Sequence, residues 1–234
     1  MEIKTIATGS SGNCYLVADG ATRLLLDAGI PISRISEGCD YQLAKIAACL
    51  VTHIHKDHSR AVKDLSRRGV LVYGTAEMRE NKMPVRDVSL CQGRLKGIYC
   101  FNVGTFEIRA FRVPHDCECY GYLIHSNKTD ERLVYLTDLS EIPFRFKDVD
   151  YWLVEANYSL DILDKNVENG TDAEYANRVI NTHLSVEKLE QYFRTYEHMT
   201  AREIILIHLS DGNSDADDFR RRIERASGCA VIVA

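Results

Sequence analysis

The hydrophobic positions of the chain fall into short runs that polar and glycine-containing turns separate. Short apolar runs bounded by such turns are typical of strands, whereas apolar positions three and four apart are typical of amphipathic helices. In the first part of the chain this pattern predicts strands at residues 3–7, 14–17, 23–26, 47–51 and 70–73, a connector with helical potential at 32–41, and helices at 59–68 and 75–81.

The second part of the chain changes to strands that alternate with helices, and residues 88–94 follow no clear pattern. No internal repeat, low-complexity segment or long linker separates the elements. We therefore expect a single domain over residues 1–234, in which two sheets pack face to face with helices outside. The expected strands are 97–101, 106–113, 120–125, 132–136, 151–154, 203–207 and 230–233, and the expected helices are 159–164, 173–180, 186–196 and 215–226.

The composition suits a globular protein with a substantial core, since 45% of the 234 residues are hydrophobic. The net charge of -5 is not typical of proteins that grip long duplex nucleic acid through a basic face. It leaves room for a small nuclease in which metal ions hold the phosphates. The chain starts directly with a strand, without a signal segment, and lacks the roughly 20 apolar residues of a membrane span. We expect a cytoplasmic protein without a membrane partner.

Three histidines and an aspartate follow the strand predicted at 47–51, in the order His53-x-His55-x-Asp57-His58. His53 and His55 are two residues apart, so on extended chain their side chains point to the same side. Asp57 and His58 come where the chain turns towards a helix. Imidazole and carboxylate groups are the usual ligands of zinc and related ions. This segment therefore predicts a metal site.

Other ligand-type residues lie at the ends of predicted strands, where a layered fold brings distant residues together. His115, Asp138 and His208 each follow an apolar strand and precede a polar turn. His183 lies just before a predicted helix. These positions predict that the metal site draws further ligands from the downstream half of the chain.

The cysteines of an expected cytoplasmic protein are reduced. Cys117 and Cys119 form a single C-x-C beside His115, and a structural zinc site would need a second pair, which does not follow at a suitable spacing. Their role is left open. The two remaining histidines, His125 and His198, are expected to be solvated. The cysteines expected as small core residues are Cys14, Cys49, Cys100 and Cys229.

The motif at residues 53–58, followed in order by His115, Asp138 and His208, resembles the metallo-β-lactamase-fold hydrolases over essentially the whole chain. The resemblance implies an α+β fold, a four-layer αββα sandwich of two mixed β-sheets with helices outside, and two divalent metal ions at one edge of the sheets. Zinc is the expected metal, with manganese or iron as alternatives. The implied ligands are His53, His55 and His115 for one ion, Asp57, His58 and His208 for the other, and Asp138 as the bridge.

Several short segments narrow the resemblance to the YycJ-type (WalJ-type) branch, which is described as DNA exonucleases acting from the 5′ end. The segments at 183–185 and 208–210 also resemble the closing motifs of the tRNA 3′-processing ribonucleases of this fold. Cys117 and Cys119 differ from the pattern of this branch, in which other residues are expected between His115 and Gly121. The segments that carry the resemblance are residues 9–14, 113–116, 155–158, 183–185 and 208–210.

Two divalent ions about 3.5–4 Å apart can activate water and clamp a phosphodiester for in-line attack. Asp138 suits the bridge because one carboxylate offers two oxygens, and Asp57 belongs with it to the expected catalytic residues. His183 is not needed for the metal count, so it is the candidate for protonating the leaving group. Its alternative role is that of a residue that merely lines the cleft.

Further residues are candidates for contacts around this chemistry. Ser10, Ser11 and Asn13, on a glycine- and serine-rich turn, are candidates for binding a substrate phosphate, with a plain hairpin loop as the alternative. Asp27 and Glu155 follow strands and are candidates for orienting metal ligands from behind. A loop or helix cap is the alternative for Asp27.

The sequence therefore predicts a dinuclear-metal-dependent phosphodiester hydrolase, a 5′-exonuclease-like nuclease on single-stranded or end-exposed DNA rather than RNA. The alternative is a hydrolase of a small cyclic or modified phosphodiester, or of a lactone or thioester. A metal-binding protein without catalytic activity is disfavoured, because the ligand set is complete. The polarity of cleavage and the oligomeric state are left open.

Overall fold

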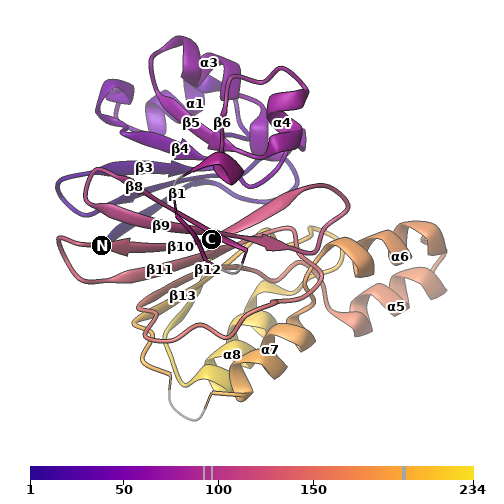
Figure 1. Cartoon of the computed structure of the whole chain (residues 1–234). Coiled ribbons are helices and arrows are strands. Elements are labelled where there is room, and N and C mark those ends of the chain that lie inside the picture. Colours follow the sequence, from indigo (N-terminus) through magenta and orange to yellow (C-terminus); the bar gives the residue numbers. More distant parts are fainter. Residues whose placement is uncertain (92, 96, 197–198) are drawn as a thin grey trace. The chain divides into compact units, whose positions relative to one another are not determined.

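The computed structural model describes residues 1–91, 93–95, 97–196 and 199–234 (Figure 1). The described chain divides into two compact units, and His198 lies outside the described residues. Unit 1 comprises Met1–Arg112 and Cys117–Arg132, and unit 2 comprises Val113–Asp116 and Leu133–Ala234. The expected single domain over residues 1–234 remains a prediction.

Unit 1 contains a six-stranded sheet whose strands follow one another in chain order. The sheet is mixed, because its first three strands pair antiparallel and the remaining neighbours pair parallel. The parallel part brings the carboxyl ends of neighbouring strands to one edge. The strands are β1 (Glu2–Ala7), β2 (Cys14–Ala18), β3 (Arg23–Leu26), β4 (Ala48–Leu50), β5 (Leu71–Gly74) and β6 (Arg86–Asp87).

Four further strands of this part of the chain follow, namely β7 (Arg94–Leu95), β8 (Ile98–Val103), β9 (Phe106–Val113) and β10 (Cys119–Ser126). β8 pairs antiparallel with both β7 and β9. The short strands β6 and β7 fall at the edges of the segment that the hydrophobic pattern left unassigned, because two-residue strands carry no periodicity. The helices of unit 1 are α1 (Ile32–Gly38), α2 (Lys56–Ser59), α3 (Val62–Arg67) and α4 (Ala76–Glu80).

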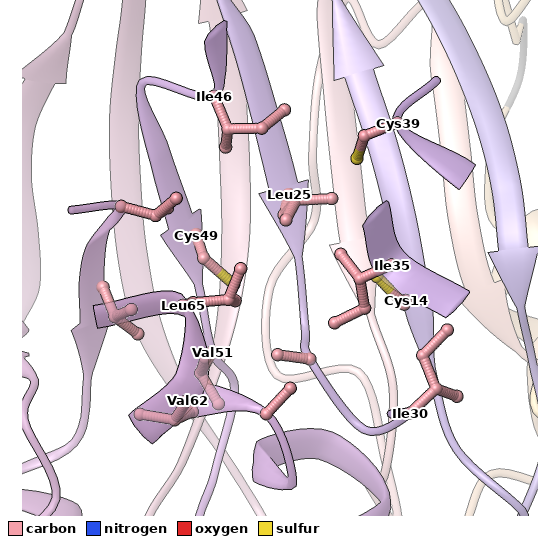
Figure 2. Close-up of a cluster of buried hydrophobic side chains, with 14 of the residues drawn as sticks. Cys14, Leu25, Ile30, Ile35, Cys39, Ile46, Cys49, Val51, Val62 and Leu65 are labelled. Atoms are coloured by element: carbon pink, nitrogen blue, oxygen red, sulfur yellow. The ribbon is translucent and has the colours of Figure 1, made fainter. Parts of the chain in front are cut away.

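An apolar cluster forms the core under the six-stranded sheet of unit 1. Figure 2 shows Cys14, Leu25, Cys49 and Val51 among its members. Burial raises the pKa of both thiols well above their usual range, so these cysteines are inert core residues, as predicted. The prediction is wrong for Cys100 and Cys229, which are only half-buried.

The helix predicted at 59–68 starts earlier and is interrupted. The carbonyl of Asp57 accepts from the Asn13 N–H at 2.8 Å, and the carbonyl of His58 accepts from the Ala28 N–H at 2.8 Å. The N–H of Ala61 in turn donates to the Ala28 carbonyl at 2.8 Å. These long-range bonds use groups that a continuous helix needs for its own ladder, so the helix divides into α2 and α3.

Unit 2 contains four parallel strands in the order β14-β13-β12-β11. Trp152 of β12 is buried against Phe146 and Phe193, at ring separations of 5.7 and 5.2 Å. The strands are β11 (Arg132–Leu136), β12 (Tyr151–Glu155), β13 (Glu203–Ile207) and β14 (Val231–Val233), and the helices are α5 (Leu160–Glu168), α6 (Ala173–Thr182), α7 (Val186–Arg194) and α8 (Ala216–Ser227).

The helices of unit 2 begin and end where the sequence provides caps. Ser185 caps α7 by accepting from the Lys188 N–H, and Asp215 caps α8 by accepting from the Asp218 N–H. Gly228 ends α8 in the left-handed conformation, which costs glycine little. No helix in the described part of the chain is both long enough and apolar enough to cross a membrane.

Candidate metal centre

The carboxyl ends of the parallel strands β3 and β4 place Asp27 beside the segment that carries the histidine motif. Asp27 is fully buried, and its Oδ1 accepts from the Thr52 N–H at 2.8 Å. Its Oδ2 lies 2.7 Å from Nδ1 of His58. The carboxylate therefore holds both the start of the motif and the ring of its last histidine.

This contact decides which nitrogen of His58 faces the rest of the site. A carboxylate at Nδ1 fixes the ring proton there, so that Nε2 carries the lone pair. Nε2 lies 3.1 Å from Asn13 Nδ2, which donates to it, and 3.3 Å from Asp57 Oδ2. Asn13 also accepts from the Gly9 N–H at 3.0 Å and is fully buried. Asn13 thus supports the histidine motif, and its burial disfavours the predicted contact with substrate.

His53 and His55 lie together with a cysteine that the sequence left without a role. Potential ligand atoms of His53, His55 and Cys117 lie within 4.8 Å of one another. Nδ1 of His53 lies 2.9 Å from Thr52 Oγ1 and 3.8 Å from the sulfur of Cys119. Unit 1 therefore collects two imidazoles and a thiol at one point.

The second half of the candidate residues meets in unit 2, at the carboxyl ends of three neighbouring parallel strands. Asp138 follows β11, Glu155 ends β12 and His208 follows β13, while His183 is the residue after α6. Potential ligand atoms of these four residues lie within 4.8 Å of one another. The strand-end positions that the sequence singled out thus converge within this unit.

Glu155 connects two of the histidines in this cluster. Its Oε1 lies 2.7 Å from Nδ1 of His183 and 2.9 Å from Nδ1 of His208. Its Oε2 accepts from the backbone N–H groups of Leu184, at 3.1 Å, and Leu139, at 3.3 Å. The buried carboxylate thereby fixes two rings and the backbone behind them.

The charges of Glu155 and His183 stabilise each other. Burial opposes the charged carboxylate of Glu155, but the neighbouring His183 and His208 outweigh it and lower the pKa. Burial likewise opposes the charged imidazole of His183, but Glu155 outweighs it and raises the pKa of His183. The two residues form a hydrogen-bonded carboxylate–imidazole pair, which the sequence did not indicate because 28 residues separate them.

His115 is a further histidine of unit 2 in the described part of the chain. Its Nδ1 donates to the carbonyl oxygen of Thr182 at 3.1 Å, so its Nε2 is the nitrogen with the lone pair. Nε2 lies 3.2 Å from Asp116 Oδ1 and 3.9 Å from Asp138 Oδ2. His115 therefore turns its lone pair towards carboxylates of the same unit.

Backbone strain marks the same positions. Among the described non-glycine residues with positive φ, most are exposed turn residues, but Asp27, Asp138 and His208 are buried. Their φ angles are 57°, 52° and 56°. Such conformations cost about 1 kcal/mol or more in a non-glycine residue and persist where the surroundings enforce them. The chain leaves each strand here with a sharp bend that directs an acidic or imidazole side chain to the strand edge.

A cavity of about 290 Å³ lies beside Asp57 in unit 1. Ser10 and Ser11 of the glycine- and serine-rich turn line it, together with Lys56 and Arg60. Neither cation forms an ion pair with any other described residue. The two serines line this cavity, and their contact with a substrate phosphate remains a prediction. The two cations beside them were not predicted.

The two units contain strand-end clusters of histidine and carboxylate side chains characteristic of the metal-dependent hydrolases with a metallo-β-lactamase fold. Residues 22–209 match the beta-lactamase superfamily domain. The chain is 30% identical over 233 residues to exodeoxyribonuclease WalJ of Streptococcus pneumoniae serotype 2 (strain D39 / NCTC 7466), covering 89% of this chain and 81% of that protein. It therefore belongs to the beta-lactamase superfamily, among its YycJ-type (WalJ-type) members, and is a metal-dependent hydrolase.

Other relatives agree with this assignment. Exodeoxyribonuclease YycJ of Bacillus anthracis is 27% identical over 179 residues, covering 70% of this chain and 65% of that protein. Among solved structures, the metallo-beta-lactamase fold protein YhfI from Bacillus subtilis has a TM-score of 0.71 at 18% identity, covering 99% of this chain and 95% of that one. Zn(2+)-bound PqqB from Methylobacterium extorquens has a TM-score of 0.69 at 16% identity, covering 100% and 97%. The predicted α+β class and metallo-β-lactamase fold are confirmed.

Proposed function

We propose that this hydrolase is a nuclease that uses two divalent metal ions to cut phosphodiester bonds of DNA, 5′-exonuclease-like and on single-stranded or end-exposed strands. The exodeoxyribonuclease names of the relatives support a DNA substrate. The observation that carries the proposal is the Glu155–His183 pair beside Asp138 and His208, because it joins a proton donor to two groups suited to a metal ion.

The chemistry of the donor set fits divalent cations. Nε2 of His58 and Oδ2 of Asp57 are electron-rich atoms 3.3 Å apart, an arrangement that a shared cation stabilises. A carboxylate orients the opposite nitrogen of His58, and another orients His208, as in most metal-ligating histidines. A cation on Nε2 of His58 would replace the hydrogen bond from Asn13.

In the proposed assignment each ion receives histidines from both halves of the sequence. Asp27 and Glu155 orient ligands without binding the ions, and zinc is the proposed metal, with manganese or iron as alternatives. His53, His55 and His115 would hold the first ion, Asp57, His58 and His208 would hold the second, and Asp138 would contribute to both.

The ions supply an activated water and charge for the phosphate, and the chain supplies the proton for the leaving group. His183 holds that proton at Nε2, since its Nδ1 faces Glu155. Glu155 outweighs the opposing effect of burial and raises the pKa of His183, which favours the acidic form that the leaving oxygen needs. Water would be the nucleophile in this hydrolysis, and His183 would give its Nε2 proton to the leaving oxygen.

Substrate phosphate is proposed to bind in the cavity beside Asp57. Ser10 and Ser11 offer hydroxyl donors there, and Lys56 and Arg60 offer positive charge. A local basic pocket is compatible with the net negative charge of the whole chain. Asn13 is assigned to holding His58 and the turn rather than to the substrate, because it is fully buried.

A panel of substrates with metal-loaded protein tests the proposal. The substrates are a 5′-phosphorylated single-stranded DNA, an RNA of the same sequence, a bis-aryl phosphodiester and a β-lactam. We expect cleavage of the DNA, faster than that of the RNA. Hydrolysis of the bis-aryl ester without the DNA would favour a small phosphodiester as substrate, and hydrolysis of the lactam alone would overturn the phosphodiesterase assignment.

A further inference from the structure

The thiol of Cys117 lies among the imidazoles of the histidine motif. Its sulfur and the ligand nitrogens of His53 and His55 lie within 4.8 Å of one another, all in unit 1. Cys117 is half-buried and forms no disulfide. The proposed two-metal centre makes no use of this sulfur.

The three ligand atoms are near enough for one ion to draw them together. Zinc binds imidazole nitrogen at about 2.0–2.1 Å and thiolate sulfur at about 2.3 Å in a tetrahedral arrangement, so two ligand atoms of one ion lie about 3.3–3.6 Å apart. The ligand atoms lie within 4.8 Å of one another here, so side-chain rotations that bring them closer by about 1 Å would close the site. Two imidazoles and one thiolate form a donor set that zinc favours, whereas manganese favours oxygen ligands.

Cys119, two residues further on, occupies a different place. Its sulfur lies 3.8 Å from Nδ1 of His53, the nitrogen that also faces Thr52 Oγ1. Cys119 is almost completely buried at the start of β10. Cys119 therefore packs at the Nδ1 side of the His53 ring, which Thr52 also contacts. Cys117 is the cysteine that lies together with both His53 and His55.

We propose that Cys117 is a thiolate ligand of the ion that His53 and His55 bind, and that it makes this position selective for zinc over manganese. The thiol loses its proton to solvent when the ion binds. The inference rests on the proposed function only in that these two histidines hold a metal ion. A packing role is the alternative, in which a half-buried sulfur fills space beside the rings.

Cobalt substitution distinguishes these two roles without any assay of activity. Cobalt(II) bound to a thiolate shows a sulfur-to-metal charge-transfer band in the near ultraviolet, and cobalt bound to nitrogen and oxygen alone lacks it. We expect this band in the cobalt-loaded protein. We expect Cys117→Ser and Cys117→Ala to lose it while they keep the visible bands of bound cobalt.

Competition titrations measure the selectivity. Cys117→Ala is expected to lower zinc affinity at least roughly tenfold. Loss of a residue that only hydrogen-bonds a metal ligand typically lowers metal affinity by that factor, and loss of a ligand itself should lower it at least as much. Its manganese affinity is expected to stay almost unchanged. Cys100→Ala is the matched control, since Cys100 is also half-buried in unit 1 and lies in β8. It should keep both the charge-transfer band and the wild-type zinc affinity.

The outcomes separate this inference from the proposed function. A wild-type cobalt spectrum without the charge-transfer band, or a band that persists in Cys117→Ala, overturns the role of Cys117 whatever the activity. Equal losses of zinc and manganese affinity overturn the selectivity. Absence of DNA cleavage in a protein that shows the Cys117-dependent band would instead overturn the nuclease assignment and leave the ligand in place.

Discussion

Oε1 of Glu155 lies 2.7 Å from Nδ1 of His183, and this buried carboxylate orients the imidazole and raises its pKa. The contact orients the histidine that is proposed as the proton donor and that neither proposed ion uses as a ligand. Because the same oxygen also faces Nδ1 of His208, the proposed proton donor and a proposed metal ligand share one anchor. The proposed chemistry therefore depends on Glu155 as strongly as on the residues that it orients.

The first prediction concerns His183. His183→Ala removes the proposed acid without removing a proposed ligand, so we expect both metals to stay bound while kcat falls by about 10²–10⁴-fold. Metal content by elemental analysis and turnover on DNA are the two measurements. Loss of metal together with activity would show that His183 is a ligand instead.

Removal of the proposed bridge should act differently. Asp138→Ala takes away the carboxylate that both ions are proposed to share, so we expect the bound metal to fall along with activity. Asp138→Asn keeps the shape of the side chain with one oxygen less and should retain part of the metal. Full metal content and turnover in Asp138→Ala would exclude the bridging role.

Asp27→Asn tests the orientation of His58. Asparagine keeps the size of the side chain but weakens the hold on the Nδ1 proton, so we expect metal affinity to fall about 10–100-fold. The measurement is a chelator competition titration, with circular dichroism to show that the fold is retained. If metal affinity stays at the wild-type value, the contact with His58 serves the fold alone.

The cavity beside Asp57 gives a prediction about salt. The slope of log affinity against log salt is negative, and each removed phosphate contact to a single strand should reduce its magnitude by about 0.7. We expect this for Lys56→Ala and Arg60→Ala in binding of 5′-phosphorylated single-stranded DNA, measured by fluorescence anisotropy in the His183→Ala background to keep the strand intact.

Lys63→Ala is the matched control for this experiment. Lys63 lies on the neighbouring helix α3, is exposed and does not line the cavity. Its slope should match that of the unmodified background. Equal slopes in all the variants would place the DNA elsewhere.

The last prediction concerns stability and pH. Arg222 of α8 donates to Glu187 at 3.0 Å and to Glu190 at 2.8 Å, both on α7. Burial opposes ionisation of both carboxyls, but the bonds to Arg222 and neighbouring groups outweigh it and lower their pKa values below 4.5. A carboxyl whose pKa is lower in the folded than in the unfolded protein stabilises the fold at pH values above its unfolded-state pKa. This stabilisation is lost as the pH falls through the folded-state pKa.

Arg222→Met should therefore reduce the free energy of unfolding by about 1–2 kcal/mol at pH 7, since the pairs are only partly exposed. The difference from the wild type should shrink as the pH falls below 4.5, where protonation of the carboxyls weakens the wild-type pairs as well. Urea denaturation at both pH values measures this. A difference that does not depend on pH would assign the effect to packing of the arginine stem.

Most elements could be predicted from the sequence because each strand is a short apolar run between turns, and the ligand-type residues were found because they follow those runs. The interruption between α2 and α3 could not be predicted from the sequence, since it depends on hydrogen bonds from Asn13 and Ala28, which belong to other segments of the chain. The local pattern at residues 59–68 predicts one helix, and the long-range hydrogen bonds override it.

The sequence by itself determined which residues are proposed to hold metal ions, because histidine and carboxylate positions at strand ends are a local property. Only the tertiary structure decided the partners: Asp27 meets His58 across 31 residues, and Glu155 meets His183 across 28. Such pairs depend on which strands are neighbours and on how sharply the chain bends at their ends. The same is true of Cys117, whose place beside His53 and His55 comes from packing and has no signal in the local sequence.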